Sequence, residues 1–304
     1  MNYQKIIEKL HHDVNTIPDE GVVASYIPAL KKVDSTKFGV SLCTITNECF
    51  GEGNFEEKFS IQSISKVFGL TLALKLIGTK LWNRVDVEPS GDPFNSLVQL
   101  EFEKGIPRNP LINSGALVVC DVLISELENP KKELLQFVQK LANNKNINYN
   151  LEVMQSETKH GFKNAAHVNL MKSFNNINNN VDEVLDLYYH MCSLEMTCLE
   201  LSNAFLIFAN GGKLLHNNEQ IITARISKRI NATILTCGLY DEAGEFAFRV
   251  GLPGKSGVGG GIVAIHPNNY VITVWSPKLN AKGNSFKGMN FLEKFTTETA
   301  SSIF

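Results

Sequence analysis

Segments rich in strand-forming residues lie near both ends of this 304-residue chain, and helical patterns fill the middle. Near the start, residues 38–43 are rich in strand formers and turn residues follow at 51–54, which is typical of a hairpin. Strand patterns return only late, separated by turn residues, at 246–250, 261–265 and 270–275. Two early strands and three late ones predict one antiparallel sheet built from both ends of the chain.

Helical periodicity covers much of the remaining sequence. The helical patterns are at 1–15, 131–142, 181–192, 196–210 and 286–303. We therefore predict an α/β fold of the α+β kind, with residues 1–304 as a single domain. An antiparallel sheet flanked by helices, from about 1–60 and 225–304, would form one lobe. A helical lobe would span about 63–215, and a cleft between the lobes is a natural place for a site.

Charge and hydropathy exclude several classes of partner. The net charge is −2 and the runs of Lys and Arg are short, so we expect neither nucleic acid nor an acidic membrane surface as a partner. The amino-terminal segment lacks the uninterrupted apolar core of a secretory signal. No apolar run approaches the ~20 residues of a membrane span. We therefore expect a cytoplasmic protein.

Six cysteines are present, and no two of them form a C-x-x-C pair. This spacing suggests neither a zinc site nor a redox pair, so we expect no bound metal. Most of them lie in apolar surroundings, and we expect buried, reduced thiols. The six are Cys43, Cys49, Cys120, Cys192, Cys198 and Cys237.

A Ser-x-x-Lys motif occurs twice, at 63–66 and at 156–159. Ser63 follows a polar turn and opens a strongly apolar helix, one helical turn before Lys66 on the same face. A serine hydroxyl becomes a good nucleophile only when a base takes its proton, and burial lowers the pKa of a lysine toward that role. The second copy lies in polar sequence, so we discard it. An N-capping serine beside a solvent-reaching lysine is the structural alternative for the first.

A second signal supports Ser63. Lys255-Ser256-Gly257 is the only Lys-[Ser/Thr]-Gly in the chain, and it lies just before the predicted strand at 261–265. Ser-x-x-Lys at a helix start together with a late Lys-[Ser/Thr]-Gly is the skeleton of acyl-serine enzymes of the β-lactamase and penicillin-binding group. Backbone amides here and at Ser63 are candidates for an oxyanion hole.

From about residue 22 to its end, the chain resembles the serine-dependent glutaminase family. The blocks that carry the resemblance are SYIPAL, FSIQSISKVF, EPSGDPFNS, GIPRNPLINSGALVV, GFKN, CSLEMTC, LTCGLYDEAGEFAFRVGLPGKSGVGGGI and VWSP-LN-GNS. The resemblance implies a β-lactamase-like fold and hydrolysis of L-glutamine to L-glutamate and ammonia (EC 3.5.1.2) without metal or cofactor. We also expect a homo-oligomer, either a homodimer or a homotetramer.

The resemblance assigns the catalytic roles by motif. Ser63 resembles the family nucleophile and Lys66 its proton acceptor, while Tyr240 resembles the tyrosine that relays a proton to departing ammonia. Lys255 would hold positive potential over the site, which favours a neutral Lys66, and Gly257 supports the same strand.

Substrate contacts follow from the same resemblance. Glutamine carries an ammonium and a carboxylate at one end, so an anion suits the first and neutral donors suit the second. Val258 would give its backbone amide to the amide oxygen. The residues expected to bind substrate are Tyr26, Gln62, Asn113, Glu157, Asn164, Tyr188 and Val258.

Two other functions are alternatives at this stage. One is a β-lactam-interacting serine hydrolase of the same fold, for which Ser173-Phe174-Asn175 is a formal match to the middle motif. Its helix-like context and the missing export signal argue against it. The other is a non-catalytic amino-acid binder, against which the intact Ser63, Lys66, Tyr240 and Lys255 argue.

Overall fold

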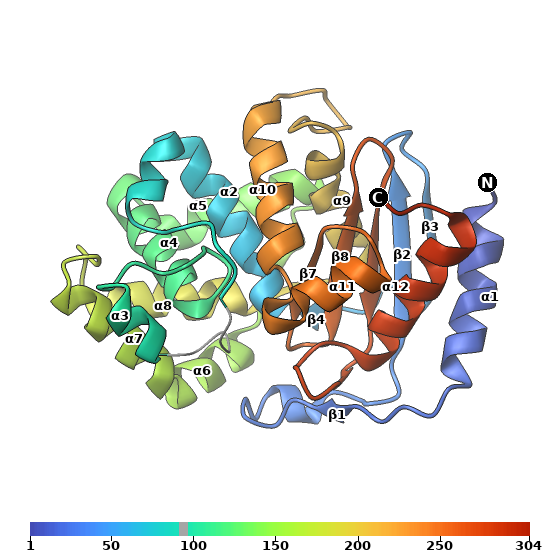
Figure 1. The fold of residues 1–304 in the computed structure, drawn as a ribbon, viewed down its shortest axis with the longest axis horizontal. Helices are drawn as coiled ribbons and strands as arrows, with labels where there is room; N and C mark the ends of the chain where they lie inside the picture. Colours follow the sequence, from blue (N-terminus) through green and yellow to red (C-terminus); the bar gives the residue numbers. More distant parts are fainter. Residues whose placement is uncertain (91–96) are drawn as a thin grey trace.

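The computed structural model describes residues 1–90 and 97–304. Residues 91–96, which belong to the EPSGDPFNS block, lie outside the described part. In Figure 1 a sheet with its covering helices occupies one side of the molecule, and a group of helices occupies the other. Every helix in the described ranges is too short or too polar to span a bilayer.

Five antiparallel strands form the main sheet in the order β3-β2-β9-β8-β7. These strands are β2 (Gly39–Thr44), β3 (Cys49–Gly53), β7 (Gly254–Gly257), β8 (Gly261–His266) and β9 (Tyr270–Trp275). The early strand β2 pairs along its whole length with the late strand β9. The prediction of one antiparallel sheet built from both ends of the chain is therefore confirmed.

One predicted strand is wrong. Residues 246–250 lie mainly in helix α11 (Ala243–Arg249), and the third late strand is β7, which carries the Lys-Ser-Gly motif. Their Phe-Ala-Phe pattern alternates as a strand does, but Phe246 packs into the core while Phe248 is 91% exposed. The two rings therefore point to different sides, as helical geometry requires and strand geometry forbids.

The position of the early hairpin turn was also wrong. The turn between β2 and β3 lies at residues 45–48, and the glycines at 51 and 53 belong to β3 itself. A Cβ at Gly51 would lie 2.5 Å from the Phe55 ring. The glycine is there because an aromatic ring covers the strand, and not because the chain reverses.

Alternating side chains send the two faces of the sheet to different helices. Val40 and Leu42 join an apolar cluster with α1 (Tyr3–Asn15) and α12 (Phe286–Thr299). Val263 and Ile265 face the other way and join the larger cluster that includes α9 (Cys198–Ala209). The sheet is thus covered on both faces, and α9 lies between it and the group of helices on the other side of the molecule.

The helical patterns of the sequence are confirmed to within a few residues. They correspond to α1, α9 and α12 and to α5 (Pro130–Ala142) and α8 (Val181–Cys192). The other α-helices are α2 (Lys66–Ile77), α3 (Leu97–Phe102), α4 (Asn113–Glu126), α6 (Leu151–His160), α7 (Phe162–Ser173) and α10 (Ala224–Cys237). The 3₁₀ helices are η1 (Leu30–Lys32), η2 (Gln62–Ser65), η3 (Gly78–Asn83) and η4 (Tyr240–Glu242). Small sheets join β1 (Val22–Val23) to β10 (Lys278–Leu279), and β4 (Phe59–Ser60) to β6 (Leu194–Met196) and β5 (Asn148–Tyr149).

Helix α2 is the centre of the helical group. Every residue from 66 to 74 is buried, so the helix is surrounded on all sides rather than along one stripe. Its neighbours include α4, α5 and α8. This placement takes the side chain of Lys66, the first residue of the helix, out of contact with water.

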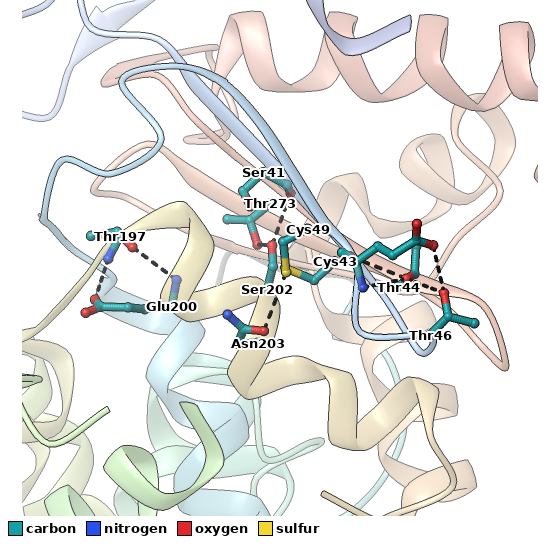
Figure 2. Close-up of a disulfide and its surroundings, with 11 residues drawn as sticks. Ser41, Cys43, Thr44, Thr46, Cys49, Thr197, Glu200, Ser202, Asn203 and Thr273 are labelled. Carbon is teal, nitrogen blue, oxygen red and sulfur yellow. Dashed lines mark hydrogen bonds between the residues drawn. A yellow bond between two sulfur atoms is a disulfide. The ribbon is translucent and has the colours of Figure 1, made fainter. Parts of the chain in front are cut away.

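Two of the six cysteines are not the reduced thiols that the sequence suggested. Cys43 and Cys49 face each other across the β2–β3 pair, with Cα atoms 4.2 Å apart, and form a disulfide. Figure 2 shows the disulfide beside Ser202 and Asn203 of α9. Their six-residue separation carried no known motif, so only the strand register reveals the pair. The other four cysteines are buried and free, as expected.

Candidate active site

A pocket of about 580 Å³ lies where η2, α6, α7, α8 and η4 meet. All of the predicted site residues line it except Lys66, Lys255 and Gly257, which lie behind its wall. The pocket is lined by Tyr26, Ile27, Gln62, Ser63, Asn113, Glu157, His160, Gly161, Phe162, Lys163, Asn164, Tyr188, Cys192, Tyr240 and Val258. The volume is in the usual range for a small-molecule site.

Ser63 lies on the short 3₁₀ helix η2 that leads directly into α2. Gln62, just before it, has a positive φ of 49°, and so has Tyr240 across the pocket, at 55°. Two non-glycine residues in this conformation mark backbone that the surroundings hold in place. Tyr240 interacts with the Ser63 side chain, and this interaction opposes the rise in the pKa of Tyr240 that burial causes. Ser63 is not the capping residue of α2, so that part of the structural alternative is wrong.

Lys66 is a buried amine rather than a lysine that reaches to solvent. Its side chain is 1% exposed, and Nζ donates to the Leu111 carbonyl at 3.2 Å and to Asn113 Oδ1 at 2.6 Å. Burial lowers the pKa of Lys66 to about 8. The second Ser-x-x-Lys copy differs in this respect, because Lys159 on α6 is exposed.

A second buried lysine also lies against the ring of Tyr240. Lys255 Nζ donates to the carbonyls of Gly238 and Ser256, at 2.8 and 2.7 Å. It lies 4.2 Å from the centre of the Tyr240 ring, and Lys66 Nζ lies 5.5 Å from the same centre. Burial, and after it the charge of Lys66, holds the pKa of Lys255 well below its usual value. The two amines disfavour simultaneous protonation.

Glycines let strand β7 lie directly against η2. A Cβ at Gly257 would lie 2.3 Å from the Ile61 carbonyl oxygen, and one at Gly259 would lie 2.1 Å from that of Ser60. Side chains at these positions would push the two segments apart. The close approach places Val258 on the same pocket wall as Ser63.

Polar and ionisable side chains also line the pocket. Glu157 is only 8% exposed, and burial raises its pKa to about 7, although a hydrogen bond with Gln62 and the charge of Lys66 oppose the shift. Asn113 Nδ2 donates to Asn164 Oδ1 at 3.0 Å. Tyr26 is 56% exposed as a residue, yet desolvation raises its pKa.

Several lining residues were not found from the sequence. His160, Phe162 and Lys163 flank the recognised Glu157 and Asn164 on α6 and α7. Their proximity to those motif residues was the available signal. Cys192 is a buried thiol, and burial raises its pKa. The formal middle motif at 173–175 is exposed and does not line the pocket.

Comparisons with known proteins all find glutaminases. The family model described as Glutaminase matches residues 21–304. Glutaminases of Christiangramia forsetii and Saccharophagus degradans are 56% and 54% identical, over all of this chain and 100% and 99% of their own. The structure of a probable glutaminase, YbaS, superposes with a TM-score of 0.94 at 31% identity, over 99% of this chain and 97% of that one.

A probable glutaminase from Bacillus subtilis, complexed with 6-diazo-5-oxo-L-norleucine, superposes with a TM-score of 0.89 at 30% identity, over 100% of this chain and 98% of that one. The mixed α/β fold is that of these structures. The matches decide between the functions left open by the sequence. The chain belongs to the glutaminase family, whose members hydrolyse L-glutamine to L-glutamate (EC 3.5.1.2).

Proposed function

We propose that this chain hydrolyses glutamine through a covalent acyl-enzyme on Ser63, on a β-lactamase-like fold. The observation that carries the proposal is the surroundings of one hydroxyl. Ser63 lines the pocket, its side chain interacts with Tyr240, and the buried amine of Lys66 follows one helical turn later. A serine needs such a base to become nucleophilic.

The hydrogen bonds of Lys66 favour its role as that base. A neutral amine has two N–H groups and one lone pair, and two protein acceptors, Leu111 O and Asn113 Oδ1, take up two donors. The lone pair is then left for a third direction, which we assign to Ser63. With a pKa of about 8, about one amine in ten is neutral at pH 7. An ordinary lysine would be neutral in fewer than about one in a thousand molecules.

The reaction then runs in two halves. Ser63 Oγ bonds to the side-chain carbonyl carbon of glutamine as Lys66 takes the hydroxyl proton, and the carbonyl electron pair moves onto oxygen. Backbone amides of Ser63 and Val258 stabilise that oxyanion. The carbon–nitrogen bond breaks as Tyr240 gives its proton to the leaving nitrogen and receives one from Lys66. Water repeats the sequence on the ester and releases glutamate.

Tyr240 passes protons without becoming an anion. Burial raises its pKa, so a free phenolate is disfavoured and both of its proton transfers must be concerted. Its ring lies close to the amines of both Lys66 and Lys255. The low pKa of Lys255 argues against the positive potential that the sequence led us to expect from it, so we assign Lys255 a supporting role through its contact with the Tyr240 ring rather than through charge.

The polar side chains that line the pocket fit a free amino acid. Glu157 is the anion for the substrate ammonium, and Asn164, Tyr26 and Tyr188 supply neutral donors for the carboxylate. Asn113 has a second role in addition to substrate binding. Both ends of its amide are engaged, one by Lys66 and one by Asn164, so it couples the base to the substrate-binding residues.

Residues 1–304 are proposed as one domain, because a single apolar cluster joins sheet residues such as Val263 to the helical group around α2. The homodimer or homotetramer expected from the resemblance stays a prediction.

Replacing Ser63 tests the acyl-enzyme. We expect Ser63→Ala to release ammonia from glutamine at least about 10³-fold more slowly than wild type. In wild type treated with a diazoketone analogue of glutamine, peptide mapping by mass spectrometry should find the adduct on the peptide that contains Ser63. Ser156→Ala, in the discarded copy of the motif, is the matched control and keeps near wild-type activity. Equal ammonia release by Ser63→Ala and wild type would disprove the proposal, as would an adduct on another residue.

A further inference from the structure

A buried carboxylate links the turn that carries Tyr240 to a neighbouring loop. Glu242 lies two residues after Tyr240 on the same 3₁₀ helix and is 4% exposed. Its Oε1 and Oε2 accept from Asn280 Nδ2 at 2.9 and 3.0 Å, and Oε2 also accepts from Asn284 Nδ2. Both asparagines belong to the loop between β10 and α12. We call this contact the Glu242 clamp.

Backbone hydrogen bonds fix the orientation of the Asn280 side-chain amide. Asn280 Oδ1 accepts from the backbone N–H groups of Lys282 and Asn284, each at 3.0 Å. Its amide therefore cannot turn over without losing both bonds, and its NH₂ group must face the Tyr240 turn. Only an acceptor satisfies a buried NH₂ group, so an apolar residue at position 242 would leave it without a partner.

The clamp also reaches the opposite wall of the pocket. The loop that holds the two asparagines follows β10, and β10 pairs with β1 shortly before Tyr26. Leu279 of β10 packs in a small apolar cluster with Ala24 and Ile27. One contact thus ties the turn of Tyr240 to the segment that bears Tyr26.

We propose that Glu242 is a positioning residue for hydrolysis, which holds the Tyr240 hydroxyl against Ser63. Tyr240 has a positive φ of 55°, a conformation that a tyrosine keeps only when its surroundings impose it. Without the clamp the turn relaxes and the hydroxyl leaves its position. The inference rests on the proton relay proposed for Tyr240. Glu242 itself does not line the pocket and touches no substrate.

Two substitutions at position 242 separate the clamp from its charge. Glu242→Ala removes the acceptor, and we expect kcat to fall about tenfold or more while KM for glutamine stays within about twofold. Glu242→Gln keeps one oxygen for Asn280. Its new NH₂ group meets Asn284 Nδ2, another donor, so the Asn284 amide has to turn over and accept through Oδ1, a buried atom that has no partner among the described residues. It should recover most of kcat.

Controls come from the same two segments. Glu245 joins Arg249 and Lys282 by ion pairs at 3.3 and 3.5 Å, so it also bridges α11 and the 280–284 loop, but its side chain is 45% exposed. Glu245→Ala should leave kcat unchanged. Asn284→Leu weakens the clamp from the far side and should lower kcat several-fold, which keeps the inference testable if Glu242→Ala does not fold.

A double-mutant cycle with Tyr240→Phe gives the decisive result. If Glu242 acts through Tyr240, then Glu242→Ala costs little further kcat in the Tyr240→Phe background. The same fold-loss in both backgrounds would overturn the inference, as would wild-type kcat in Glu242→Ala or Asn284→Leu. Full turnover by Tyr240→Phe alone would instead overturn the proposed relay, so the two failures are distinguishable.

Discussion

At the scale of single residues, burial brings the pKa values of two side chains closer to neutral pH, one from above and one from below. Desolvation lowers the pKa of Lys66 to about 8 and raises that of Glu157 to about 7. The cause is the same in both, because removal from water disfavours whichever form is charged. The consequences differ, since Lys66 must lose its charge to act as a base and Glu157 must gain one to bind an ammonium.

The pH dependence of catalysis follows from those two shifts. In the proposed mechanism both groups work when deprotonated, so kcat/KM for glutamine should rise with pH, first through about 7 and then through about 8. Glu157→Gln should raise KM at least about tenfold and remove the lower step. The upper step should remain in kcat, because Lys66 is intact. Initial rates across the range check this, and a kcat independent of pH through that upper step would contradict the assigned base.

The sequence was sufficient to identify these residues but not their contacts. Ser63 and Lys66 share one motif, and the apolar sequence that follows predicted the burial of Lys66. The interaction of Tyr240 with Ser63 and the hydrogen bond between Lys66 and Asn113 join segments far apart in the chain. No spacing rule relates such positions, and only the fold brings them together.

At the scale of elements, the contact of β7 with η2 depends on the absence of side chains. Gly257→Ala would place a Cβ 2.3 Å from the Ile61 carbonyl, so β7 must move away from the turn that carries Ser63. We expect kcat/KM to fall about 10²-fold, because the Val258 amide and Ser63 separate. The melting temperature should also fall by several degrees.

The control for that substitution is Gly244→Ala. Gly244 lies in helix α11, and an added Cβ there meets nothing within 4 Å. Alanine should therefore keep kcat/KM at the wild-type value and add up to about 1 kcal/mol of stability. Steady-state kinetics and thermal unfolding of the two variants, side by side, measure both effects. Equal activity in the two would show that β7 can shift without disturbing the site.

Elements were predicted well where periodicity was long and poorly where it was short. Helices such as α5 and α8 have several turns of apolar repeat, and their bounds agreed closely. The five residues at 246–250 fit either period, so local pattern could not decide between strand and helix. Tertiary packing decided it by burying Phe246 and exposing Phe248.

At the scale of the whole molecule, the two edges of the sheet serve different purposes. The edge strand β7 lies against η2 and carries the Lys-Ser-Gly motif, while the other edge strand, β3, carries the disulfide. Three strands separate them. The distribution of strand patterns along the sequence predicted the sheet, but the order of its strands came only from the structure, because antiparallel pairing of both chain ends allows several orders.

That separation predicts a disulfide that affects stability and not catalysis. The double variant Cys43→Ala/Cys49→Ala opens a loop of only a few residues, and closing so short a loop stabilises the fold by about 2 kcal/mol. The midpoint of urea unfolding should fall accordingly, while kcat/KM for glutamine stays unchanged. Thiol titration of the denatured wild type should find the four free cysteines rather than six. A large loss of kcat in the double variant would mean that the β3 edge is coupled across the sheet to Ser63.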